Sequence, residues 1–171
     1  MTPKNLHELY VYQLRDLYSA EKEIIAALPK MVKKASNPAL QNAFETHLEQ
    51  SKRQKERLEQ IFDALDESPK GKTCKAIQGL IAEAEDFISD AKKLFGSDSP
   101  SEVLDAGLIA QAQRVEHYEI SAYGTAASYA EILGRLDDNK LLSATLGEEK
   151  ETDAKLNTLA KSMVNPAAVG A

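Results

Sequence analysis

Apolar residues recur along this chain at alternating three- and four-residue spacings, a pattern typical of one face of an α-helix. One such stripe contains an acid among apolar residues: Tyr10, Leu14, Leu17, Glu21, Ile24, Leu28 and Met31. A second stripe contains two: Leu142, Leu146, Glu149, Asp153, Leu156, Ala160 and Met163. An uncompensated charge in a dry core is very costly, so a carboxylate there must be neutralised, paired or bound to a cation. The pattern therefore predicts a metal site inside a helix bundle.

The same periodicity, with its breaks, predicts five helices. The capping signals Thr2-Pro3 and Asn37-Pro38 open helices that extend to about residues 34 and 66. A break over residues 67–72 precedes a shorter helix that ends near residue 96. A fourth helix begins in residues 99–102 and extends to about residue 134. Asp137 is the expected N-cap of the fifth helix, which ends near residue 165.

Long helices joined by short connections favour antiparallel packing. We therefore expect an all-α fold, a ferritin-like antiparallel four-helix bundle with an additional short helix in the crossover between its second and third helices. Residues 1–165 are expected to form this single domain, and residues 166–171 a flexible tail.

Composition and net charge favour a globular protein and disfavour one that binds nucleic acid. The 171 residues are 43% hydrophobic and 28% charged, which fits one globular domain with a continuous core. A net charge of −6 disfavours a nucleic-acid-binding protein. The densest basic cluster is interleaved with glutamates and is expected to be a solvent-exposed helix face: Lys52, Arg53, Lys55 and Arg57.

The single cysteine, Cys74, excludes an intrachain disulfide and a thiolate metal cage. The N-terminal residues contain no apolar signal segment, and no apolar run approaches the ~18 residues of a membrane span. We therefore expect a cytoplasmic protein that binds no membrane.

Each of the four long helices places a possible metal ligand on its inward stripe. These candidates are Glu21, His47, Glu116 with Glu119, and Glu149 with Asp153. Acids three or four residues apart share a helix face, so each pair can hold one ion or bridge two. Many carboxylates with one imidazole and no thiolate suit iron or manganese better than structural zinc.

Simpler roles remain open for the same residues. Glu21 can pair with a lysine or arginine, and His47 can be a hydrogen-bonded core histidine. His117 lies one residue off the stripe, which fits a place beside a ligand or on the surface. Tyrosines are expected to pack in the core or to hydrogen-bond a metal ligand: Tyr18, Tyr118 and Tyr123.

Four stretches of the chain resemble the YciF-type stress proteins, a bacterial ferritin-like family of unknown function: residues 17–23, 43–49, 112–119 and 148–153. The resemblance covers about residues 5–162. It implies a fold similar to the di-iron bundle of rubrerythrin, a homodimer and a role in stress responses. Rubrerythrin-like sites use Glu on the first helix, Glu-x-x-His on the second, Glu-x-x-Glu on the third and Glu-x-x-x-His on the fourth.

Glu21 and the Glu116-x-x-Glu119 pair match that pattern, whereas Asp153 stands where a histidine is expected. The second helix has Phe44 three residues before His47, so its acid is missing or is supplied by a neighbour: Glu49 or Gln50.

The leading functional hypothesis is a stress protein with two iron or manganese ions that react with peroxide or oxygen, as in a ferroxidase or peroxidase. Its electron donor is unknown, because the chain lacks a rubredoxin-type cysteine cluster. The alternative is a non-catalytic helical dimer acting through protein contacts. A third possibility, a monooxygenase with an organic substrate, requires an apolar pocket beside the metals.

Overall fold

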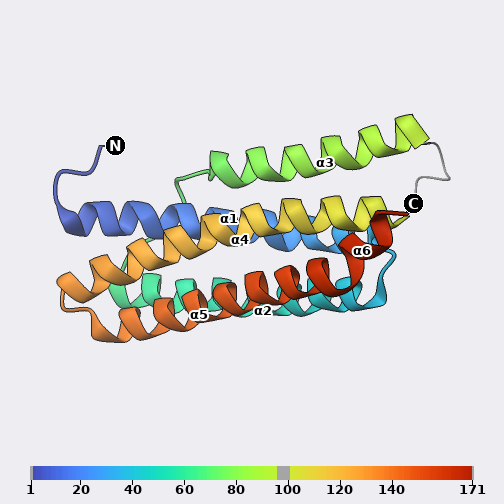
Figure 1. Cartoon of the computed structure of the whole chain (residues 1–171). Coiled ribbons are helices and arrows are strands. Elements are labelled where there is room, and N and C mark those ends of the chain that lie inside the picture. Colours follow the sequence, from blue (N-terminus) through green and yellow to red (C-terminus); the bar gives the residue numbers. More distant parts are fainter. Residues whose placement is uncertain (1, 96–100, 171) are drawn as a thin grey trace.

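A computed structural model of the chain describes residues 2–95 and 101–170. Its antiparallel four-helix bundle, drawn in Figure 1, consists of α1 (Leu6–Lys34), α2 (Pro38–Leu65), α4 (Ser101–Ile132) and α5 (Leu136–Leu159). The additional helix α3 (Lys75–Phe95) lies outside the bundle, against α1 and α4. The fold predicted from the sequence is confirmed, including the helix in the crossover.

The helix starts show which capping signals act in the folded chain. The side chain of Asn37 accepts hydrogen bonds from the backbone of α2, as predicted. The cap of α1 is Asn5, whose side chain accepts from Glu8 N at 2.8 Å, so the predicted start at Thr2 is wrong. Asp137 lies inside the first turn of α5 and does not cap it, although its charge suits the helix dipole there. The predicted start of the fourth helix at residues 99–100 lies outside the described residues.

The C-terminal end of α5 departs from regular α-helical spacing. A π-helical turn, Ala160–Val164, follows α5 and leads into the short helix α6 (Asn165–Ala168). A π-turn holds more residues than an α-turn, so the inward positions shift along the chain. Val164 is therefore buried, whereas Met163, expected in the core, is 47% exposed.

None of the described helices combines the length and the apolarity needed to cross a membrane.

Candidate metal centre

A polar layer crosses the middle of the bundle and separates two apolar clusters. On α1, Leu17 belongs to one cluster and Ile24 to the other, with Glu21 between them. The same division recurs on the other bundle helices, and the acids and the histidine that occupy the layer are almost completely buried: Glu21, His47, Glu116, Glu119 and Glu149.

Four of these side chains meet closely enough to hold one metal ion. His47 of α2, Glu116 and Glu119 of α4 and Glu149 of α5 each offer one ligand atom, and these atoms lie within 4.8 Å of one another. His47 Nδ1 lies 3.1 Å from Glu116 Oε1. His47 Nε2 lies 3.8 Å from Glu119 Oε2 and 3.7 Å from Glu149 Oε2. The predicted convergence of buried acids from separate helices is therefore present for these residues.

Glu21 of α1 lies beside this four-residue group. Its carboxylate accepts a short hydrogen bond from the hydroxyl of Tyr123 on α4. Burial and then the charge on Glu149 raise the pKa of Glu21, and burial and then the charges on Glu149 and Glu21 raise the pKa of Glu119. Tyr123 therefore takes the hydrogen-bonding role foreseen as one alternative for the tyrosines.

The carboxylates of the layer lack compensating partners within the chain. Among the ion pairs of the described residues, none joins these acids to a lysine or arginine, so the pairing expected as an alternative for Glu21 is absent. Among the described residues, the buried side-chain atoms without a hydrogen-bond partner belong to these acids, to His47 and to two neighbours on α2: Glu21 Oε2, His47 Nε2, Ser51 Oγ, Gln54 Oε1, Glu149 Oε2 and both carboxylate oxygens of Glu116 and Glu119. Each such atom costs about 1–3 kcal/mol, and more if charged.

Burial raises the pKa of every glutamate in the layer, and for Glu21, Glu119 and Glu149 the charge of a neighbouring glutamate raises it further. Burial is the larger cause, and it raises the pKa of Glu21 and of Glu116 to about 8. The pKa of Glu149 rises to about 9, with Glu116 as the next cause, and that of Glu119 also rises well above its usual value. Without a cation these carboxyl groups hold protons at neutral pH, and a divalent cation would displace them.

Glu149 is held in place by a chain of polar contacts from α2. Gln54 donates a short hydrogen bond to Glu149 and a second one to Glu148 Oε2 at 3.0 Å. Arg57 grips Glu148 with two hydrogen bonds of 2.7 and 2.8 Å. The expectation that Arg57 belongs to a solvent-exposed basic face is wrong, because its side chain is only 21% exposed. Gln54 lies seven residues after His47, and this spacing places both residues on the same face of the helix. From the sequence, the spacing was the signal that Gln54 could also reach the polar layer.

Asp153 is not brought into the four-residue group. Its side chain is 24% exposed, accepts a 2.9 Å hydrogen bond from Gln113 and lies 3.4 Å from Nε2 of the exposed His117. The neighbouring Thr152 is buried in its place. Metal ligation by Asp153 stays a prediction.

Helix α2 contributes an imidazole but no acid to the group. Glu49 is 61% exposed and pairs with Lys52 at 2.6 Å, so the expectation that it supplies the missing acid is wrong. Gln50 instead contacts Thr152 at 3.5 Å.

The family model for a domain of unknown function, DUF892, matches residues 5–169. The chain belongs to this family. It is 44% identical to the protein YciF of Escherichia coli strain K12 over 166 residues, which are 96% of each chain. These matches confirm the resemblance to the YciF-type proteins.

Solved structures of the family share the fold. The crystal structure of the E. coli stress protein YciF has a TM-score of 0.86 and 43% identity, over 95% of this chain and 99% of that one. YcfI of Rhodopseudomonas palustris, described as a candidate structural protein, has a TM-score of 0.82 and 43% identity, over 91% and 94% of the two chains. A Xanthomonas campestris protein with 19% identity and a TM-score of 0.72 shares the fold.

The donor set of this DUF892 chain fits a metal that prefers oxygen. The layer supplies carboxylates and one imidazole, while the sulfur of Cys74 lies 3.0 Å from the hydroxyl of Tyr118 and outside the four-residue group. This combination could hold a divalent metal ion.

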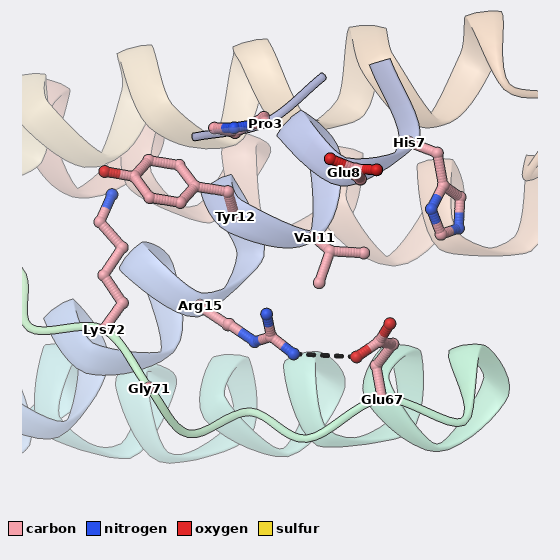
Figure 2. A pocket seen from close by; sticks show the side chains of 9 residues that line it. All are labelled: Pro3, His7, Glu8, Val11, Tyr12, Arg15, Glu67, Gly71 and Lys72. Carbon is pink, nitrogen blue, oxygen red and sulfur yellow. Dashed lines mark hydrogen bonds and ion pairs between the residues drawn. The ribbon is translucent and has the colours of Figure 1, made fainter. Parts of the chain in front are cut away.

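A surface cavity of about 350 Å³ lies away from the centre, between the start of α1 and residues 67–72. Figure 2 shows Arg15 and Glu67 pointing toward one another in it, at 2.8 Å. Its Lys72 pairs with Asp16, also at 2.8 Å. Both cationic groups are thus occupied within the chain, and the cavity offers no unpaired charge from them to a ligand.

Proposed function

We propose that this chain binds two divalent iron or manganese ions in the polar layer, and that the centre reacts with oxygen or peroxide to protect the cell under stress. The observation that carries the proposal is the set of buried carboxylate oxygens on three helices that have no hydrogen-bond partner and, among the described residues, no ion pair with a lysine or arginine. Two divalent cations would cancel the charge of the four buried glutamates.

The chain's residues have distinct roles in this proposal. His47, Glu116 and Glu149 would hold one ion, Glu21 would hold the other, and Glu119 would bridge them. Asp153 would join only after leaving Gln113. When bound, the metals supply electrons and Lewis acidity. The two apolar clusters exclude bulk water, while Tyr123 and Gln54 hold the carboxylates that they contact.

The role in stress rests on the relatives. The E. coli protein with 43% identity over almost the whole chain is described as a stress protein. The same role is proposed here because the similarity covers 95% of this chain and the two proteins share their fold.

Metal analysis tests the binding step. Protein loaded anaerobically with Fe(II) or Mn(II) and desalted is expected to retain two ions per chain and to gain about 2.7 kcal/mol at a metal concentration 100 times Kd. Glu149→Gln should lose at least one ion, because it removes the charge without changing the shape. The matched control is Asp138→Asn, a buried acid on the same helix whose partners are Tyr10 and Arg135.

The outcome of that analysis also decides the role of Asp153. Asp153→Asn should retain both ions if Gln113 and His117 keep the side chain away from the metals. Folded wild-type protein that retains no metal and shows no thermal shift would contradict the proposal.

The second candidate is a non-catalytic helical homodimer acting through protein contacts. The description of the Rhodopseudomonas relative as a candidate structural protein favours it. This function requires the buried acids to stay protonated. Sedimentation analysis of the metal-free protein tests whether it is a dimer in solution.

A further inference from the structure

Two adjoining cavities lead from the side of the bundle covered by α3 toward the candidate metal centre. The outer cavity, about 40 Å³, lies between α1, α3 and α4. The inner cavity, about 30 Å³, ends at His47 and Glu116. Four residues line both cavities: Ala27, Met31, Ile81 and Val115. The shared lining makes the two cavities direct neighbours.

The polar side chains that line these cavities belong to residues that line only one of the two. In the outer cavity these are Gln111 of α4 and the 2.7 Å ion pair of Lys30 with Glu85, which is about half exposed. In the inner cavity they are His47 and Glu116, both in the metal-binding group. The shared residues present only carbon and sulfur side-chain atoms.

We propose that the two cavities form a passage by which dioxygen reaches the polar layer. This inference rests on the proposed function and specifies its substrate as dioxygen rather than peroxide. A hydroxyl group of peroxide that enters an apolar space loses its hydrogen bonds to water and gains none in exchange, which is unfavourable. Dioxygen makes no strong hydrogen bonds to water, so it avoids this cost.

The size of the cavities supports the same assignment. Each exceeds the ~10–15 Å³ needed for one water-sized sphere. Both are far below the ~300–1,000 Å³ of pockets for organic ligands. The passage therefore fits a diatomic molecule, and it does not fit the organic substrate of a monooxygenase.

The test uses one substitution that fills the passage and one matched control. Ala27→Leu adds a branched side chain to the lining of both cavities. Ala26→Leu makes the same change at the neighbouring exposed residue, which lines neither cavity.

The first measurement uses metal-free protein, so it does not depend on the proposed function. Dissolved dioxygen is paramagnetic and accelerates the NMR relaxation of methyl groups that it contacts. Ile24, 3% exposed, lines the inner cavity, whereas Ile61, 1% exposed, packs in the other apolar cluster. Under oxygen pressure the Ile24 methyls should relax markedly faster than those of Ile61. The difference should vanish in Ala27→Leu and persist in Ala26→Leu.

The second measurement compares oxidants on iron-loaded protein. In the oxygen reaction two ferrous ions lose one electron each, and dioxygen takes up two electrons and two protons and leaves as hydrogen peroxide. Ala27→Leu should slow this oxidation about tenfold, while oxidation by added peroxide and the number of bound ions should not change.

Three results would contradict the proposal that the two cavities form a passage for dioxygen. These are equal relaxation of Ile24 and Ile61 in wild-type protein, undiminished relaxation of Ile24 in folded Ala27→Leu, and equal slowing of oxidation by both oxidants. The comparison of Ile24 with Ile61 in wild-type protein needs no variant. If wild-type protein binds no iron, the proposed function fails, and the relaxation measurement still decides the passage.

Discussion

At the scale of single residues, neutral hydrogen-bond donors position the acids of the polar layer. Tyr123 donates to Glu21, and Gln54 donates to Glu149. A neutral donor fixes the orientation of a carboxylate without cancelling its charge, so the charge stays available for a cation. Residues that orient metal ligands in this way typically contribute about 10–100-fold to metal affinity.

We expect Tyr123→Phe to lower the affinity for Mn(II) about tenfold without changing the number of bound ions. Anaerobic calorimetric titration measures this affinity. The matched control is Tyr10→Phe, because Tyr10 is also completely buried and donates to a carboxylate, Asp138, at 3.0 Å. Both variants should lose about 1–2 kcal/mol of stability, but only Tyr123→Phe should weaken metal binding. Equal affinities in the two variants would contradict this role for Tyr123.

At the scale of elements, the placement of α3 depends on a close contact with α4. A Cβ atom at Gly107 of α4 would lie 2.0 Å from Cζ of Phe87 of α3, so glycine is required for this approach. The exposed ion pair between Arg114 and Glu83, at 3.4 Å, also joins the two helices. Such exposed pairs contribute about 0–1 kcal/mol, and the Phe87 contact is therefore the more important attachment.

Gly107→Ala should displace α3, because the ring of Phe87 cannot keep its place beside a methyl group. We expect faster hydrogen exchange of the α3 amides and a stability loss of about 1–3 kcal/mol. In Gly124→Ala, on the same helix, the new Cβ would lie 3.9 Å from Leu146, an ordinary contact. This control should be neutral or slightly stabilising.

The double variant Gly107→Ala/Phe87→Ala should exchange no faster than Phe87→Ala alone, because the clash is gone. Faster exchange in the double variant would show that another contact at Gly107 is responsible.

At the scale of the whole molecule, the polar layer couples folding to the binding of protons. The pKa of Glu21 is about 8 in the folded chain, against 4.5 for an unperturbed glutamate. Between these values the unfolded chain releases the proton while the folded chain keeps it, so stability falls as pH rises. For one such group the change is on the order of 5 kcal/mol, which is comparable with the ~5–15 kcal/mol net stability of a domain.

Metal-free protein in chelator should therefore become less stable from about pH 5 to about pH 9. Thermal unfolding followed by circular dichroism at several pH values measures the slope. Saturating Mn(II) should reverse the slope, because the cation binds the deprotonated form. Glu149→Gln should flatten the metal-free profile, since the amide does not titrate. A metal-free profile that rises over this range would contradict the assignment of raised pKa values to the layer.

The sequence alone determined the bundle and the acids Glu21, Glu116, Glu119 and Glu149, because the helical repeat sets which face a side chain occupies. Only the tertiary structure decided that Thr152 rather than Asp153 turns inward, because adjacent helical residues differ by about 100° and packing sets the rotation of α5. It also decided the chain of contacts from Arg57 to Glu149 and the two cavities beside α3. Both features bring together residues that are far apart in sequence. Their contacts depend on how far each helix is displaced along its axis relative to its neighbours, and the spacing of residues within one helix does not determine this displacement.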